Sequence, residues 1–169
     1  MNNYEVRALK FAETVLAPLF QDCYTLSDYE NQIFNYNVTH KRPLRYAHGV
    51  SRITILRNDY VIKFDIIPTG SFSDGRAGDC ESELQVYERA IEDGFSHLLA
   101  KPSLHYWGSK PFLIQPLIRG VGLRTDWWSF CSDEEEYWLD HNIYDLHAYN
   151  YGFRKGQICI FDYAWGSRQ

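Results

Sequence analysis

Apolar residues in the N-terminal part of the chain recur at the spacing of an α-helix. Over residues 6–20 they stand three and four positions apart, which predicts a helix that Pro18 should kink or end. A second, shorter helix is predicted over residues 27–36, with Ser27 as its N-cap. The first part of the chain should therefore be helical.

Two more helical patterns lie further along. Residues 79–92 carry apolar side chains on one helical face and are followed by Gly94, a residue suited to the end of a helix. Ser132 can cap a helix over residues 133–140, whose first turn holds four acidic residues. Because the N-terminal end of a helix dipole is positive, we interpret this acidic run as complementing the dipole rather than as a metal site.

Elsewhere the pattern changes to that of β-strands. Six segments show it: residues 44–47, 52–57, 60–66, 104–107, 112–118 and 157–161. Short connections at Asn58-Asp59 and Gly108-Ser109-Lys110 predict two hairpins, one from the second and third segments and one from the fourth and fifth. Residues 68–78, rich in Gly, Ser and Asp, should form a mobile loop. Strands grouped around single helices predict an α+β fold.

Composition narrows the range of functions. The chain has 169 residues, 45% hydrophobic and 23% charged, with a net charge of -5, which is typical of one globular domain with a substantial core. There is no run of Lys and Arg, so we expect no binding to nucleic acid. No apolar stretch approaches the length of a membrane span and no secretory signal is recognisable, so a cytoplasmic protein without a membrane partner is expected.

Aromatic residues make up 17% of the chain and gather in its C-terminal third. Trp127-Trp128, Tyr137-Trp138, Tyr149 and Tyr151 are the main examples. Such side chains either fill a small core or form an exposed surface for a protein partner. If they are exposed, the region 120–150 should mediate a homodimer or a complex with another protein, and the N-terminal helices should brace the fold.

The segment Asp145-Leu146-His147-Ala148-Tyr149-Asn150 is followed by Asp162 at the end of a short apolar run. Acidic and amide side chains at this spacing can together bind a divalent metal ion and a triphosphate. Asp145 can orient or deprotonate an attacking hydroxyl group. Asn150 and Asp162 offer the hard oxygen ligands that Mg²⁺ prefers.

Phosphoryl transfer also needs groups that hold the nucleotide phosphates. Lys63 lies mid-strand in Val61-Ile62-Lys63, where a lysine can contact phosphates when a helical glutamate holds it. Glu83 is the preferred partner because it shares a helical face with Tyr87, which should point inward. Glu81 is the alternative.

With these residues identified, the region 49–162 resembles the protein-kinase-like superfamily. It is more similar to the small-molecule branch, the aminoglycoside and choline phosphotransferases, than to eukaryotic protein kinases. The resemblance implies one minimal kinase-like domain over residues 1–169. Its parts would be N-terminal helices over 1–40, an antiparallel sheet lobe with one helix over 44–118, and a strongly reduced helical lobe over 119–169.

The resemblance also implies a role for each matching residue. The implied catalytic residues are Asp145, Lys63 and Glu83, the implied nucleotide-binding residues are Gly49, Ser51, Lys63 and Gln115, and the implied metal ligands are Asn150 and Asp162. ATP and Mg²⁺ would be the cofactors. Gly49 and Ser51 fall where a loop covers the phosphates, and Gln115 falls in the strand that leads to the adenine-contacting hinge.

The match departs from the family pattern in several places. The phosphate loop has one glycine, and Asp162-Tyr163-Ala164 stands where the family has D-F-G. His147 follows Asp145 by two residues, as in the D-x-H form of the small-molecule kinases. Only seven residues follow Asp162, where the family places its acceptor-binding helices, so that platform is expected to be largely missing.

Three functions remain open on this basis. The first is a phosphotransferase that uses Mg-ATP on an unidentified acceptor. The second is a kinase-fold binding or effector protein without catalysis, such as a phage-encoded inhibitor of a host protein. The third is a metal-dependent hydrolase built on His141, Asp145, His147 and Asp162, which leaves Lys63 and Glu83 without a role.

Overall fold

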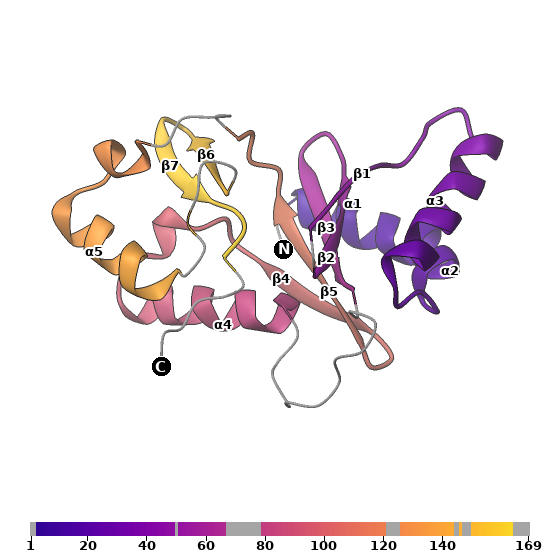
Figure 1. Ribbon diagram of the computed structural model, residues 1–169, viewed down its shortest axis with the longest axis horizontal. Coiled ribbons are helices and arrows are strands. Elements are labelled where there is room, and N and C mark those ends of the chain that lie inside the picture. The colour runs from indigo at the N-terminus through magenta and orange to yellow at the C-terminus, as the bar shows by residue number, and fades with distance from the viewer. Residues whose placement is uncertain are drawn as a thin grey trace. The chain divides into compact units, whose positions relative to one another are not determined.

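The computed structural model describes residues 3–49, 51–66, 79–120, 126–143, 146 and 150–163 (Figure 1). Its helical elements are α1 Asn3–Phe11, the π-helical η1 Ala12–Leu16, α2 Ala17–Phe20, α3 Leu26–Thr39, α4 Asp79–Glu92, the 3₁₀ turns η2 Ser96–Leu98 and η3 Trp127–Phe130, and α5 Asp133–Asn142. Its strands are β1 Arg45–His48, β2 Arg52–Leu56, β3 Tyr60–Asp65, β4 Ser103–Trp107, β5 Lys110–Pro116, β6 Tyr151–Arg154 and β7 Gln157–Ile160. These elements confirm the α+β class.

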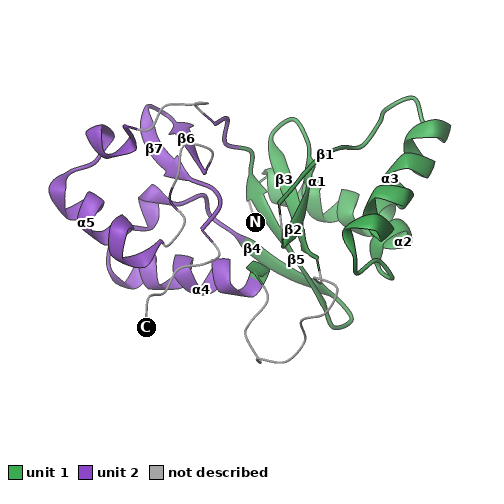
Figure 2. Ribbon diagram, in the orientation of Figure 1, with its two compact units in different colours: residues 1–80, 103–117 green, residues 81–102, 118–169 purple. Residues whose placement is uncertain are grey.

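The chain forms two compact units, which Figure 2 colours separately. The first unit comprises residues 1–80 and 103–117, and so holds the N-terminal helices and a five-stranded sheet. The second comprises residues 81–102 and 118–169, and so holds most of α4, helix α5 and the β6–β7 hairpin. Among the described residues, no helix combines the length and the apolarity that crossing a membrane requires.

The N-terminal helix continues across Pro18 instead of ending there. Pro18 has no N–H group to donate to the preceding turn. The chain adapts by widening the helix just before it, where the Ala17 N–H donates to the carbonyl of Ala12, five residues back. Helix α2 then ends at Phe20, where the sequence predicted the end of the helical stretch.

The N-cap predicted for the next helix, Ser27, is wrong. Helix α3 begins at Leu26 and is capped by Thr25, whose hydroxyl accepts the Asp28 N–H at 3.2 Å. The Asp28 carboxylate in turn accepts the Thr25 N–H at 2.8 Å. This reciprocal capping box satisfies two backbone donors, whereas a cap at Ser27 would leave both without these partners.

The sheet of the first unit is antiparallel throughout, in the order β1-β2-β3-β5-β4. Both predicted hairpins and the strand before the first of them are confirmed. The hairpin strands β4 and β5 are connected at Gly108, whose φ of 62° lies in the left-handed region that favours glycine. Helix α4 lies between β3 and β4 in the chain, and the loop predicted over residues 68–78 lies outside the described residues.

One face of this sheet forms the core of the first unit with the N-terminal helices. Alternate strand residues supply it, because successive side chains of a strand point to opposite faces. The strands contribute Ile53, Ile55, Ile62, Phe64, Phe112 and Ile114, and the helices contribute Ala8, Ala12, Leu16, Phe20, Tyr29 and Ile33, all buried. Phe64 lies at the centre of the aromatic contacts of this core.

Lys110, the first residue of β5, holds the end of α2. Its ammonium group donates to the carbonyl of Phe20 at 2.7 Å and to the carbonyl of Cys23, and lies 4.7 Å from the centre of the Tyr29 ring. Burial lowers the pKa of Lys110 to about 8. The lysine therefore satisfies carbonyls that the end of a short helix leaves without intrahelical partners.

The second unit has its own core, formed by α4, α5 and the β6–β7 hairpin. Its buried residues are Val86, Ala90, Leu98, Leu99, Trp138, Leu139, Ile143, Tyr151, Ile158, Ile160 and Tyr163. The sequence predicted β7 but missed β6. The connection Lys155-Gly156 has two consecutive positive φ angles, 54° and 82°, which is the signature of a tight hairpin turn.

The C-terminal aromatic residues divide between core and surface. Trp138 and Tyr151 are buried in the second unit, which fits core filling. Trp128 and Tyr137 are exposed to 47% and 65% of their surface, which fits a partner-binding surface. Trp127 is half-buried, and Tyr149 lies outside the described residues.

Candidate functional site

Lys63 lies on the opposite face of the sheet from the aromatic core. The register places it between Thr54 of β2 and Leu113 of β5, and it is only 4% exposed. Gln115, fully buried, lies on the same face because its partner, Val61, is two residues from Lys63 on β3. The structure therefore brings together, on one buried face, two of the residues assigned to nucleotide binding.

Helix α4 starts against the strand that carries Lys63. The Cys80 N–H donates to the Asp65 carboxylate at 3.0 Å, and the Cys80 thiol lies 3.6 Å from the carbonyl oxygen of Lys63. Glu83 follows Cys80 by three residues, so it lies on the same face of the helix one turn later. Glu83 is fully buried and Glu81 is half-buried.

A charged cluster that the sequence analysis missed lies beside Lys63. Arg52 is paired in the register with Asp65, and its Nε is 4.0 Å from the carboxylate of Asp79 at the start of α4. The pKa of Asp65 is raised to about 6, chiefly by burial and also by the neighbouring Asp79 carboxylate, although the hydrogen bonds from Cys80 and the charge of Arg52 act to lower it. The sequence did contain a signal for Asp65. Because side chains alternate between the two faces along a strand, Asp65, two residues after Lys63, lies on the same face as Lys63.

This raised pKa makes the stability of the protein depend on pH. Because the folded state binds the Asp65 proton more tightly than the unfolded chain, the stability from this group is fully present below about pH 4 and is lost as the pH rises through about 6. The variant Asp65→Asn keeps an oxygen for the Cys80 N–H but carries no charge. It should raise the free energy of unfolding at pH 7 by about 1–2 kcal/mol, measured by urea unfolding.

The same substitution should have a much smaller effect at pH 4, where Asp65 is protonated in the folded state and about half protonated in the unfolded chain. Asp22→Asn, which changes an exposed carboxylate of the same unit, is the matched control and should leave the pH dependence unchanged. An equal gain at pH 4 and pH 7 would contradict the assignment of the effect to the Asp65 charge.

The predicted phosphate loop is the short connection between β1 and β2. The Gly49 N–H donates to the carbonyl of Arg52 at 2.9 Å, and the Ser51 carbonyl accepts the N–H of Ile66 at 2.7 Å. Gly49 is exposed and Ser51 half-buried, while Val50 lies outside the described residues. The two described residues of this loop are thus held by backbone hydrogen bonds at one end of the sheet.

Asn150 and Asp162 lie at the same end of the β6–β7 hairpin. The register pairs Tyr151 with Ile160, and beyond that pair the Phe161 N–H donates to the Asn150 carbonyl at 2.9 Å. Asp162 is the next residue along the chain. Asn150 is 7% exposed and Asp162 half-buried. A buried amide and a carboxylate at the end of a hairpin offer the oxygen atoms that Mg²⁺ requires.

Strand β7, which precedes Asp162, is also hydrogen-bonded to Ala100, outside the hairpin. The Ala100 N–H donates to the Ile160 carbonyl at 2.7 Å, and the Tyr163 hydroxyl donates to the Ala100 carbonyl at 2.5 Å. Asp162 therefore stands between two anchored residues, which restricts the backbone that positions its carboxylate.

The remaining predicted site residues are Asp145 and the two histidines of the hydrolase hypothesis. Asp145 and His147 lie outside the described residues. His141 is exposed, and its Nδ1 hydrogen-bonds the Tyr137 carbonyl of its own helix at 2.7 Å. Within the described ranges there is no group of three His, Cys, Asp or Glu residues that could hold a metal ion. The hydrolase hypothesis therefore depends on residues that the structure does not describe.

The predicted site residues divide between the two compact units. Gly49, Ser51, Lys63 and Gln115 belong to the first, and Glu83, Asn150 and Asp162 to the second. The structure groups Lys63 with Gln115, and Asn150 with Asp162. The pairing of Lys63 with Glu83 stays a prediction. The five-stranded antiparallel sheet with a helix between its third and fourth strands agrees with the order of elements predicted from the sequence.

Comparison with known proteins identifies no family for the chain. No family model and no curated protein matches it. Two solved structures of WbdD are similar. One, a co-crystal structure with the kinase inhibitor LY294002, is 15% identical with a TM-score of 0.43, over 73% of this chain and 32% of that one. The other, a 2.2 Å crystal structure, is 16% identical with a TM-score of 0.45, over 73% and 33% of the chains. This chain spans about a third of the WbdD chains.

Proposed function

We propose that this protein is a minimal kinase-like phosphotransferase that uses Mg-ATP. The observation that carries the proposal is the burial of two opposite charges, Lys63 at 4% exposure on β3 and Glu83 at 0% on the helix that follows. Lysine and glutamate are almost never fully buried unless they are paired. A strand lysine held by a helical glutamate is the device with which kinases hold nucleotide phosphates.

The other residues have consistent roles in this proposal. Lys63 contacts the phosphates, and Gln115 lies on the same buried face, where it can contact the nucleotide. Asn150 and Asp162 supply oxygen ligands, and Asp145 accepts the proton of the attacking hydroxyl group. When bound, Mg²⁺ neutralises charge on the β- and γ-phosphates. The acceptor is not specified by these residues.

A thermal-shift titration tests the proposal. Millimolar Mg-ATP should raise the melting temperature, because a ligand that binds only the folded state stabilises it by mass action, by about 2.7 kcal/mol at one hundred times the dissociation constant. ATP with EDTA should give a smaller shift, and Asp162→Asn should remove the difference between the two conditions. The absence of any shift in a folded sample would refute the proposal.

A matched pair of lysine variants tests whether the nucleotide binds at Lys63. Lys63→Met removes the buried charge and should abolish the shift, whereas Lys101→Met removes an exposed lysine and should leave the shift intact. The same pair separates phosphotransferase from hydrolase, because a hydrolase built on His141 and Asp162 would be indifferent to Lys63.

A non-catalytic binding protein is the second candidate. The observation that favours it is the exposure of Trp128, Phe130 and Tyr137 at 47%, 40% and 65%. Large exposed apolar side chains gathered on one short region mark partner surfaces. In this case the region 120–150 would mediate a homodimer or a heteromeric complex, and the folded protein would give no response to Mg-ATP.

A further inference from the structure

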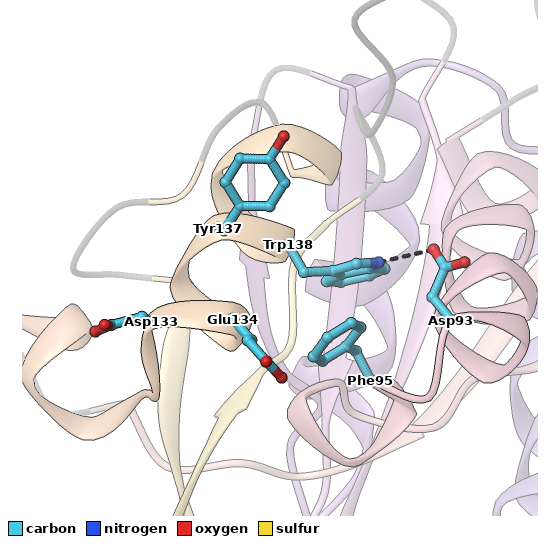
Figure 3. Close-up of a pocket in the computed structure, with 6 residues that line it drawn as sticks. All are labelled: Asp93, Phe95, Asp133, Glu134, Tyr137 and Trp138. Carbon is cyan, nitrogen blue, oxygen red and sulfur yellow. Dashed lines mark hydrogen bonds between the residues drawn. The ribbon is translucent and has the colours of Figure 1, made fainter.

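The second unit contains a pocket of about 540 Å³ that lies outside the proposed nucleotide and metal residues (Figure 3). It is lined by Asp93, Phe95, Asp133, Glu134, Tyr137 and Trp138. The Phe95 and Trp138 rings stack with centroids 5.5 Å apart, and the indole N–H of Trp138 donates to the Asp93 carboxylate at 2.8 Å. The pocket therefore combines an aromatic wall with a carboxylate that a hydrogen bond holds in place.

A second hollow of about 300 Å³ lies next to it. Its lining residues are Trp127, Asp133, Glu136, Tyr137, Asp140 and His141. The two hollows share Asp133 and Tyr137, so Tyr137 forms a ridge between them. The Tyr137 side chain is 65% exposed, and the His141 imidazole lies against one face of its ring, with the two ring centres 3.9 Å apart, which leaves the other face for a ligand. We call the two hollows and this ridge the acidic double pocket.

The charge of the acidic double pocket is strongly one-sided. Its lining residues include five carboxylates, Asp93, Asp133, Glu134, Glu136 and Asp140, and neither lysine nor arginine. Acids in the first turn of α5 complement the helix dipole, which accounts for three of them. Asp140 lies near the other end of α5, where the dipole disfavours negative charge, and Asp93 lies outside this helix. A dipole role therefore does not account for the whole set.

We propose that the acidic double pocket binds a basic peptide segment, with one Arg or Lys side chain in each of its two hollows. Carboxylates attract the cationic heads, and the faces of Tyr and Trp rings attract cations further. The aromatic walls also receive the apolar stems of long basic side chains. The two adjoining hollows match a segment with two cationic side chains better than a single small cation. This inference is independent of the nucleotide site.

The probe is a fluorescein-labelled peptide with two arginines separated by a short glycine spacer, added to the full chain at low salt. We expect saturable binding that weakens as NaCl is added, because salt screens exposed charges. The double variant Glu134→Gln with Asp140→Asn should weaken binding about three- to tenfold. Tyr137→Ala, at an exposed side chain, should weaken it by about threefold or more.

Glu88→Gln is the matched control, because it removes an exposed carboxylate from α4 outside the acidic double pocket. It should leave the dissociation constant unchanged. A peptide with citrulline in place of both arginines keeps the shape but not the charge and should not bind. Equal binding of the citrulline peptide, an equal effect of Glu88→Gln, or no binding of the arginine peptide would each overturn the proposal.

A second copy of this chain is the competing occupant, since Lys41, Arg42 and Arg45 are exposed on the first unit. Sedimentation velocity distinguishes it. A dimer that is lost both in the variant Lys41→Ala with Arg42→Ala and in the variant Glu134→Gln with Asp140→Asn would show that a second copy occupies the acidic double pocket, and would overturn the proposal. A monomer that binds the peptide with the expected variant effects supports it.

Discussion

Replacing Phe64 with alanine should lower the free energy of unfolding by about 3–5 kcal/mol, the loss typical of a large aromatic side chain removed from a core. Phe64 is fully buried on β3, and its ring centre lies 5.3 to 5.9 Å from those of Phe20, Tyr29, Trp107 and Phe112. The substitution leaves a cavity where the N-terminal helices meet the sheet. Urea unfolding followed by circular dichroism measures the loss.

Phe34→Ala is the matched control for this experiment. Phe34 lies on α3 in the same unit, but its side chain is 69% exposed. Its removal should change the free energy of unfolding by about 0.5 kcal/mol or less. Comparable losses for the two variants would show that the aromatic cluster around Phe64 is not the core of the first unit.

Gly152→Ala should lower the free energy of unfolding by about 2–3 kcal/mol. Gly152 on β6 forms a bridge with Gly120, so that the backbone of residues 118–120 passes directly over it. A Cβ atom at Gly152 would overlap the Arg119 carbonyl oxygen and would lie 2.8 Å from the Ile118 Cγ2 and 2.9 Å from the Arg119 carbonyl carbon. Because two of these atoms are backbone, relief requires the strand to move.

Gly120→Ala tests the same bridge from its other side. A Cβ atom there would meet only ordinary contacts, at 3.7 Å from Phe161 Cζ and 3.8 Å from the Tyr151 carbonyl oxygen. We expect a change of about 0.5 kcal/mol or less, by the same urea measurement. A tolerated Gly152→Ala would contradict the close approach of these two segments.

Helix boundaries were predictable where the signals are local. Residues 79–92 form a helix with the predicted bounds, because Gly94 adopts a φ of 85° that a residue with a side chain rarely takes. Ser132 caps α5 as predicted, with the Glu135 carboxylate accepting the Ser132 N–H at 2.8 Å. In both cases the residues that decide the boundary lie within a few positions of it.

The sequence prediction was wrong at two places where the deciding signal is local, the N-cap of α3 and strand β6. The capping box of Thr25 and Asp28 competes with the nearby Ser27, and the observed pair satisfies two donors where a single cap satisfies one. Strand β6 is four residues long and includes Gly152, so its alternation is too short to distinguish it from a loop. The Lys155-Gly156 connection was the signal that could have indicated it.

For the candidate site, the sequence predicted the chemistry of the residues but not their surroundings. It placed Lys63 on a strand and Glu83 on a helix, and both elements are confirmed. It also placed Glu83 on the inward face of its helix, but it could not predict that Lys63 is buried, because burial of a strand residue depends on what covers each face of the sheet. Arg52 and Asp65 were missed for this reason, since charged residues at strand ends are usually exposed.

By itself, the sequence determined the α+β class, the two hairpins of the sheet, helices α4 and α5, and the position of Asp162 at the end of a strand. These features follow from periodicity, caps and turns, which act over a few residues. Only the tertiary structure decided that Lys110 holds the end of α2, that Gly152 lies beneath residues 118–120, and that hollows flank Tyr137. Each of these joins segments far apart in the chain, and their contacts depend on packing that no local pattern encodes.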